Sequence, residues 1–421
     1  MSEFNKIIGY DCVKEELRQI CDMIHNKEVY EKLGAKMSKG LLIYGDPGLG
    51  KTLMARAFIK ESGRNAYTIR RNKPDGDFVN EIKNIFNEAK VNAPSVILLD
   101  DMDKFVVKDD SKEEYVAIQA CIDEVQFSDV YVIATANSLR SVPKSLVRAG
   151  RFDRKIMIDT PKGDDAVKII RYYMGTKAFV AEVNVEDIAK LLGGKSCAEL
   201  ETILNEAAIY AGAERKDRIE TNHIVRVILR DNYGMDNSFL AVDAAKLEKT
   251  AYHEAGHLVM SEILEPDGIG VASLKVSKGG SVGGFVNSCK DGEIFEHQIL
   301  IGLAGKAAVE LQYGIIDEGA SKDLGKVVEI ITKGVMGIGM AGLGVVEVFD
   351  GYDDPSATLR AKQEAVVHAE LERYFYKAKE IISRNKGFVD TAVAELLKKK
   401  TLLNSDIKKL REQCGPFDVA F

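Results

Sequence analysis

The residues with the clearest chemical potential are two histidines spaced four apart, His253 and His257, with Glu254 beside the first. Residues 247 to 259 carry apolar side chains at helical spacing, so we expect a helix here. Four residues make a little more than one helical turn, so both imidazoles leave the same face and can hold one metal ion. A neighbouring carboxylate can take a proton from water that a zinc ion activates. The His-Glu-x-x-His pattern is typical of zinc-dependent peptidases.

A catalytic zinc site also needs a third protein ligand, which local spacing does not identify. Four carboxylates further along the chain could serve: Glu310, Asp317, Glu318 and Asp323. A second feature of the predicted helix is Gly256, which costs a helix about 1 kcal/mol relative to alanine. We therefore expect another backbone or side chain to pack closely against it.

A second chemical pattern lies in residues 45 to 52, which read Gly-Asp-Pro-Gly-Leu-Gly-Lys-Thr and fit the phosphate-binding loop G-x-x-x-x-G-K-[ST]. The loop follows a predicted strand and precedes a predicted helix, so its backbone N-H groups can face phosphate oxygens at the helix N-terminus. Lys51 is expected to reach the outer phosphates and Thr52 the magnesium ion. The residues expected to contact the nucleotide in this loop are Asp46, Pro47, Gly48, Leu49, Gly50, Lys51, Thr52 and Leu53.

Polar residues follow the later strands of the same region. Asp100 and Asp101 come directly after the apolar run 96–99, at the sheet edge where nucleotides bind in such folds. We expect Asp100 to hold magnesium, directly or through water, and Asp101 to orient the attacking water. Asn137 ends the next strand and brings an amide to this edge. The arginine-rich loop 148–154 is expected to stabilise transition-state charge, often in the site of a neighbouring subunit.

The elements that must position these groups alternate between residues 38 and 160. Short apolar strands and amphipathic helices follow one another, which predicts a parallel sheet covered on both faces. From about residue 164 to 232 the sequence becomes helical, and long charged helices run to the C-terminus. The predicted strands are 41–44, 66–69, 95–99, 130–135 and 155–158, with helices such as 52–61 and 80–90 between them.

Length and composition narrow the class of protein. A chain of 421 residues predicts two or three domains. A net charge of -7 argues against a general affinity for nucleic acid or anionic membranes. The six cysteines are scattered, as expected for reduced thiols in the cytoplasm. No apolar run approaches the 18 or so residues of a membrane helix, and no signal-peptide pattern opens the chain. We expect a soluble, cytoplasmic chain.

Taken together, these motifs resemble the FtsH family of AAA+ ATP-dependent zinc metalloproteases over nearly all of the chain. The resemblance extends to residues 4–9, 33–57, 150–154 and 196–208. It implies an α/β P-loop AAA+ domain (1–162) with a helical lid (163–234), followed by a mainly α-helical zinc metallopeptidase domain (239–415). It also implies a ring, normally a homo-hexamer, that uses ATP or ADP, Mg²⁺ and one Zn²⁺ per subunit.

The resemblance assigns further roles around the nucleotide. Ile8 and Gly9 fall on the family's entry segment and are implied to contact the nucleotide. Asn137 falls on the polar sensor. Arg151 and Arg154 fall on the two-arginine finger, which reaches the phosphate of the adjacent protomer.

In the metallopeptidase part, residues 318–324 resemble the family's Gly-Ala-Ser-x-Asp-Leu string. The resemblance implies that Asp323 completes the zinc shell; the competing interpretation is a helix-capping carboxylate. Residues 276–285 resemble the edge strand on which the family lays its substrate peptide, where main-chain pairing gives sequence-tolerant binding.

The sequence departs from the family at several positions. Asp101 stands where the family has glutamate, one methylene longer, so water positioning is expected to be looser and ATP hydrolysis slower. The aromatic pore loop is replaced by residues 70–78, in which Phe78 either grips substrate or is the first core residue of the next helix. Cys197 replaces a glycine, and the family's transmembrane anchor is missing from this chain.

Two functions follow from these patterns. The first is an ATP-dependent zinc endopeptidase, a soluble AAA+ ring that unfolds and degrades unfolded or tagged proteins. The alternative is an AAA+ remodelling or scaffold ATPase whose peptidase domain is weakly active or inactive. Nucleic acid is not an expected partner.

Overall fold

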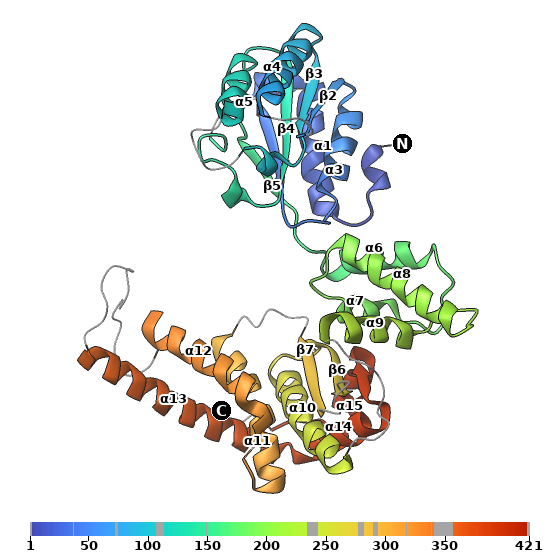
Figure 1. Ribbon diagram of the computed structural model, residues 1–421, viewed down its shortest axis with the longest axis vertical. Coiled ribbons are helices and arrows are strands. Elements are labelled where there is room, and N and C mark those ends of the chain that lie inside the picture. The colour runs from blue at the N-terminus through green and yellow to red at the C-terminus, as the bar shows by residue number, and fades with distance from the viewer. Residues whose placement is uncertain are drawn as a thin grey trace. The chain divides into compact units, whose positions relative to one another are not determined.

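The computed structural model divides the chain into two compact units (Figure 1). The first comprises Met1–Phe179 and Gly194–Ala208, and the second Val180–Gly193 and Ile209–Phe421. The structure describes all residues except 1, 37, 72–74, 107–112, 149, 234–242, 277–281, 289–293, 317, 338, 341–356 and 419–421.

The first unit is built on a five-stranded parallel sheet in the order β2-β3-β4-β1-β5. The central strands β3 and β4 are buried along their whole length, which explains their continuous apolar sequence. The predicted α/β fold with a parallel sheet is confirmed, and each predicted strand agrees with the structure to within one residue at either end. The strands are β1 (Gly40–Tyr44), β2 (Asn65–Ile69), β3 (Ser95–Leu99), β4 (Val130–Ala136) and β5 (Arg154–Met157).

Helices cover both faces of this sheet. Figure 1 shows α1 and α3 on one side and α4 and α5 on the other. The bounds are α1 (Asp11–His25), α2 (Lys27–Lys32), α3 (Lys51–Ser62), α4 (Asp75–Val91), α5 (Glu113–Glu124) and α6 (Gly163–Met174), with 3-10 turns at Glu3–Lys6, Met102–Lys104 and Leu139–Ser141. The helix α8 (Cys197–Ala213) begins in this unit and ends in the other.

Phe78 belongs to the core of the first unit. Its side chain is fully buried in α4 and meets Phe105 edge to face, with ring centroids 5.3 Å apart. A side chain in this position cannot grip a substrate, so the interpretation of Phe78 as a pore residue is wrong. The residue instead packs the start of α4 into the core of this unit.

The second unit is mainly helical, as predicted, with a small antiparallel sheet in the order β7-β6-β8. Its helices are α7 (Val185–Leu191), α9 (Thr221–Tyr233), α10 (Ala244–Leu264), α11 (Phe295–Tyr313), α12 (Ser321–Gly337), α13 (Ala357–Arg384), α14 (Lys386–Lys399) and α15 (Asn404–Cys414), with a 3-10 turn at Glu318–Ala320. The strands are β6 (Ile269–Val276), β7 (Val282–Ser288) and β8 (Thr401–Leu403). Within the described residues, β7 lies at an edge of this sheet.

The helix α10 forms the centre of this unit, because it packs against α11 on one side and the sheet on another. Ala255, Leu258 and Val259 are fully buried in the core. A Cβ atom on Gly256 would lie 2.4 Å from the carbonyl oxygen of Ala304 in α11, so only glycine permits this approach. The expectation of close packing at Gly256 is confirmed.

Two expectations from composition can be compared with the described residues. Within that part of the chain, no helix combines the length and apolar character that crossing a bilayer requires. Five of the six cysteines are described, and all five are free thiols; Cys289 lies outside the described residues.

Candidate metal centre and nucleotide-binding site

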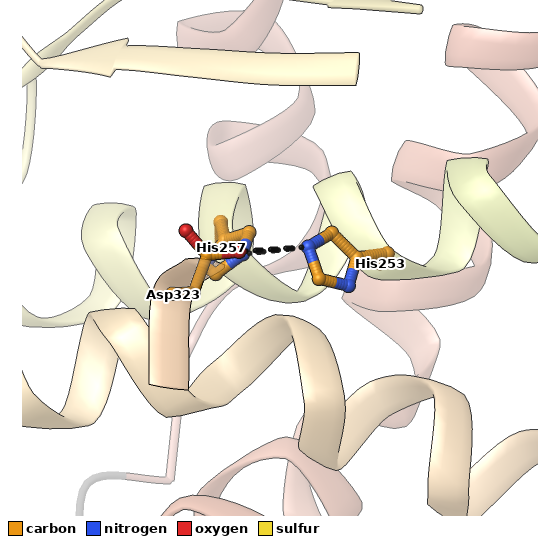
Figure 2. Close-up of side chains that lie close together, drawn as sticks. All are labelled: His253, His257 and Asp323. Atoms are coloured by element: carbon orange, nitrogen blue, oxygen red, sulfur yellow. Dashed lines mark hydrogen bonds and ion pairs between the residues drawn. The ribbon is translucent and has the colours of Figure 1, made fainter. Parts of the chain in front are cut away.

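His253 and His257 project from one face of α10 toward Asp323, the third residue of α12 (Figure 2). The two Nε2 atoms are 3.1 Å apart. The Oδ2 atom of Asp323 lies 3.3 Å from Nε2 of His253 and 3.6 Å from Nε2 of His257. Ligand atoms of all three residues lie within 4.8 Å of one another. Two imidazole nitrogens and a carboxylate oxygen form the donor set of a catalytic zinc site with three protein ligands, so the three residues fit this metal.

Among the four possible third ligands, the structure brings Asp323 to the histidines. Glu310 instead pairs with Lys306 and Lys379, and Asp317 and the side chain of Glu318 lie outside the described residues. Burial would raise the pKa of Asp323, but hydrogen bonds from His253 and His257 outweigh it and lower the pKa below its usual range. The carboxylate therefore remains ionised, as a metal ligand must be.

Two contacts with α11 fix the imidazoles in place. Nδ1 of His257 donates a hydrogen bond to the carbonyl oxygen of Ile301 at 2.7 Å, which leaves Nε2 available as a ligand. A Cβ atom on Gly305 would lie 2.5 Å from Nε2 of His257 and 2.8 Å from Cε1 of His253. Gly305 is thus part of the site, although nothing in its local sequence reveals this.

Glu254 follows His253 directly in α10 and is only 5% exposed. The backbone of β7 passes directly against it, because a Cβ atom on Gly284 would lie 2.3 Å from its Cγ. Burial raises the pKa of Glu254, while the neighbouring His257 and His253 act in the opposite direction. A carboxylate with a raised pKa is a better proton acceptor near neutral pH than an exposed one.

A cleft of about 1180 Å³ opens onto these groups. His253, Glu254, His257 and Asp323 all line it, and so does Gly284 of the edge strand β7. The predicted substrate strand at 276–285 corresponds to the end of β6 and the start of β7; residues 277–281 lie outside the described residues.

The phosphate-binding loop joins β1 to α3 in the first unit. Gly48 and Gly50 have φ angles of 80° and 86°, which favour glycine. Lys51 donates hydrogen bonds to the carbonyl oxygens of Gly45 and Asp46 at 2.7 and 2.8 Å, and to Oδ1 of Asn137 at 3.1 Å. Burial lowers the pKa of Lys51, against the attraction of nearby carboxylates. Of the other predicted contacts in this loop, Leu49 is buried, whereas Asp46, Pro47 and Leu53 are exposed.

Thr52 and Asp100, the two residues predicted to hold magnesium, meet at the carboxyl end of β3. Asp100 is almost completely buried and accepts hydrogen bonds from the hydroxyls of Thr52 at 2.8 Å and Thr135 at 2.9 Å. The carboxylate of Asp101 pairs instead with Lys104 at 2.7 Å and with Arg70 at 3.6 Å.

The structure adds one residue that the motifs do not indicate. Asp103 accepts hydrogen bonds from the backbone N-H of Asn137 at 3.2 Å and from its Nδ2 at 2.9 Å. These contacts orient the amide so that Oδ1 of Asn137 faces Lys51.

The arginine loop is held within its own unit. Arg151 donates from Nε and Nη2 to the carboxylate of Asp123 in α5, at 2.8 and 2.7 Å, and from Nη1 to the carbonyl oxygen of Ser145 at 2.7 Å. Arg154 is the exposed first residue of β5. Asp123 is a partner that sequence patterns do not identify, because it precedes Arg151 by 28 residues.

The start of α8 contacts the phosphate-binding loop. The backbone N-H of Ala198 donates to the carbonyl oxygen of Gly48 at 3.1 Å, and Cys197 is the first residue of the helix. A cysteine is therefore accommodated at this helix start.

The predicted entry segment lies near α6. Gly9 has a φ angle of 69° and lies close to Ile169 of α6, and Ile8 precedes it.

Comparison with known proteins also separates a nucleotide-binding region from a metal-binding region. Residues 41–160 match the model of the ATPase family associated with various cellular activities (AAA), and residues 240–410 match that of peptidase family M41. Curated proteins with the name ATP-dependent zinc metalloprotease FtsH are similar to almost the whole chain. Those of Leptotrichia buccalis and Ureaplasma parvum are each 29% identical over 97% of the chain, and FtsH 2 of a Thermoanaerobacter species is 29% identical over 97%.

The shared region is only part of some of these relatives. The chain spans 57% of the Leptotrichia protein, 60% of the Ureaplasma protein and 83% of the Thermoanaerobacter protein. The two family models and these relatives agree on an ATPase region followed by a peptidase region. The chain thus joins a region similar to the AAA ATPase family to a region similar to peptidase family M41, and it is similar over almost its whole length to proteins with the name ATP-dependent zinc metalloprotease FtsH.

Proposed function

We propose that this chain is an ATP-dependent zinc endopeptidase that acts on unfolded polypeptide. The observation that carries the proposal is the meeting of His253, His257 and Asp323 in one cleft beside the buried Glu254. The names of the similar proteins support the same activity.

In this proposal His253, His257 and Asp323 hold zinc. A zinc ion bound there supplies Lewis acidity, with a coordination position left open. Glu254 acts as general base through its carboxylate, taking a proton from the attacking water and delivering it to the leaving amine. The edge of β7 beside Gly284 holds the substrate backbone extended against Glu254 by main-chain pairing.

The proposed nucleotide site uses the residues around the loop of β1. The backbone of residues 46–53 and Lys51 bind the phosphates, with Ile8 and Gly9 beside the nucleotide. Thr52 and Asp100, which already share a hydrogen bond, hold Mg²⁺. Asp101 and Asn137 orient the attacking water, and Arg151 and Arg154 act on the phosphate of a neighbouring protomer.

The proposed assembly is a homo-hexameric ring with a nucleotide-binding domain (1–162), a lid (163–234) and a peptidase domain (239–415). Such a ring would thread polypeptide toward the peptidase cleft, because folded substrates resist entry by about 5 to 15 kcal/mol per domain. The free thiols support a cytoplasmic setting for this part of the protein.

Degradation of casein, an unstructured substrate, tests the proposal. We expect cleavage that depends on ATP and stops with a zinc chelator. Glu254→Gln should abolish cleavage and keep ATP turnover, whereas Lys51→Ala should abolish ATP turnover and keep cleavage of short peptides. ATP turnover without any cleavage by zinc-loaded protein would contradict the endopeptidase and support a remodelling ATPase.

A further inference from the structure

The cleft around the proposed metal centre carries an excess of lysines. Among the described residues, five lysines line it, against three carboxylates, namely Glu254, Glu265 and Asp323. We propose that this cleft selects peptides with acidic residues near the cleaved bond; the proposal rests on the peptidase function above and specifies its substrates. The lysines are Lys246, Lys249, Lys275, Lys322 and Lys326.

The carboxylates of the cleft are already engaged. Asp323 faces the two imidazoles at 3.3 and 3.6 Å, and Glu254 is buried. Glu265 lies 3.2 Å from Nδ1 of His297, and both side chains are mostly buried. Asp323 and Glu265 therefore face histidines, while Glu254 interacts with both imidazoles and with Lys275.

Three of the lysines keep their charge available for a ligand. Lys246, Lys322 and Lys326 are exposed, and none of them forms an ion pair with another described residue. The neighbouring carboxylate on α12, Glu329, pairs with Lys333 at 2.8 Å. An acidic side chain entering the cleft would therefore meet ammonium groups that have no competing partner among the described residues.

The lysines stand at defined distances from the reacting groups. Lys246 and Lys249 precede His253 on the cleft side of α10, by seven and four residues. At 1.5 Å per residue these are about 10 and 6 Å along the helix axis, or about two to three residues of an extended peptide. Lys322 and Lys326 are about one turn apart on α12 and bracket Asp323. Acidic residues two or three positions from the cleaved bond would lie beside these groups.

The charge along the cleft is asymmetric. On α10, the lysines lie before the histidines, whereas Ser261 and Glu265 lie after them. Main-chain pairing with β7 selects no particular substrate side chain. In this proposal the lysine charges therefore determine which substrate side chains are preferred. The benefit of an acidic residue should therefore be larger on one side of the cleaved bond than on the other.

Quenched fluorescent peptides of one scaffold test the proposal with the full zinc-loaded chain. Two positions on each side of the bond carry Glu, Gln or Lys. Each well-placed Glu should raise kcat/KM by about two- to fivefold over Gln, the range of exposed ion pairs, and each Lys should lower it. The gain should shrink as salt rises from 0.05 to 0.5 M, because screening weakens exposed pairs. Equal kcat/KM values for the Glu, Gln and Lys peptides would overturn the proposal.

Charge reversal identifies the source of the preference. Lys246→Glu combined with Lys326→Glu should reverse the ratio of kcat/KM between Glu and Lys peptides. The matched control is Lys333→Glu, on the same helix but outside the cleft, which should keep the ratio. Zinc content and thermal unfolding establish that each variant is folded. A preference for Glu that survives the double reversal would contradict the assignment.

Binding separates this proposal from the peptidase function itself. The affinity of the Glu254→Gln protein for Glu, Gln and Lys peptides can be measured by fluorescence anisotropy without cleavage. Tighter binding of the Glu peptide supports the acidic preference even if the wild-type chain cuts nothing, an outcome that would refute only the peptidase function. If a single-stranded oligonucleotide of equal charge displaces the Glu peptide as well as that peptide displaces itself, the lysines serve a polyanion rather than a peptide substrate.

Discussion

The metal centre and the nucleotide site differ in how completely their residues are arranged. His253, His257 and Asp323 already lie within 4.8 Å of one another on two helices. In the nucleotide site, by contrast, Lys51 is hydrogen-bonded to two loop carbonyls and to Asn137. Similarly, Asp101 pairs with Lys104, and Arg151 with Asp123.

This difference follows from the elements that carry the residues. Short side chains on packed helices have few alternative positions, and the backbone of Gly305 in α11 lies directly against both imidazoles. Long side chains at the ends of strands and helices, such as Lys51 at the start of α3, can exchange partners when phosphate arrives. The candidate metal centre, whose ligands keep one arrangement, thus lies on packed helices. The nucleotide site, whose contacts must change as nucleotide binds, uses side chains that can move from one hydrogen-bond partner to another.

The largest expected effect is on the rate of peptide cleavage, with no change at the nucleotide site. Glu254→Gln should lower the cleavage rate by about 10² to 10⁴-fold, because general base catalysis is lost. Zinc content and ATP turnover should remain at wild-type values, since the residue lies in the second unit. A parallel fall in ATP turnover would show that the substitution also impairs the nucleotide site of the first unit.

A smaller effect tests how rigid the metal centre is. Gly305→Ala places a Cβ atom against both imidazoles, so zinc affinity should fall about 10- to 100-fold, as when supporting residues of metal sites are altered. Competition with a chromogenic chelator measures this. Gly325→Ala in α12 is the control, because nothing lies within 4 Å of its added Cβ atom. Unchanged zinc affinity in Gly305→Ala would mean that the centre is not held rigidly.

In the nucleotide site, Asp103→Ala removes the acceptor that orients the Asn137 amide. The loss of two hydrogen bonds, at about 1 kcal/mol each, should lower kcat for ATP by up to about 30-fold. Asp103→Asn keeps an acceptor and should retain more activity. Cleavage of short peptides serves as the internal control and should not change in either variant.

The smallest expected effect concerns Asp101. Glutamate at this position would carry the carboxylate one methylene further from the backbone, past its present contact with Lys104. Asp101→Glu should raise ATP turnover by about two- to fivefold through better positioning of water. If ATP turnover of the Asp101→Glu variant stays constant or falls, the shorter side chain of Asp101 does not limit the rate of ATP hydrolysis.

Much of this fold could be predicted from sequence, because its strongest signals are local. The strands β3 and β4 are buried on both faces, so their sequences are continuous apolar runs. The phosphate-binding loop and the His-Glu-x-x-His helix are contiguous motifs with a fixed geometry. Spacing alone left the third metal ligand undecided among four carboxylates, and only the family resemblance selected Asp323.

The contacts that sequence did not reveal join residues far apart in the chain. Gly305 meets a helix that lies about 50 residues earlier, and Gly284 touches Glu254 from another strand. A glycine in such a place looks like any other glycine until the packing is known. The role of Phe78 was undecided for the same reason, since a buried aromatic residue and a gripping one have the same sequence pattern.

The close contact between α10 and α11 at Gly256 and Gly305 has one more consequence. His253 and His257 of α10, which is packed against α11, meet Asp323 of α12 only when the whole unit is folded, so zinc affinity is conditional on that folding. A newly made or damaged chain whose helices have separated would release its ion and, with it, the proposed ability to hydrolyse peptide bonds. The proposed peptidase activity would thereby be confined to correctly folded copies of the chain.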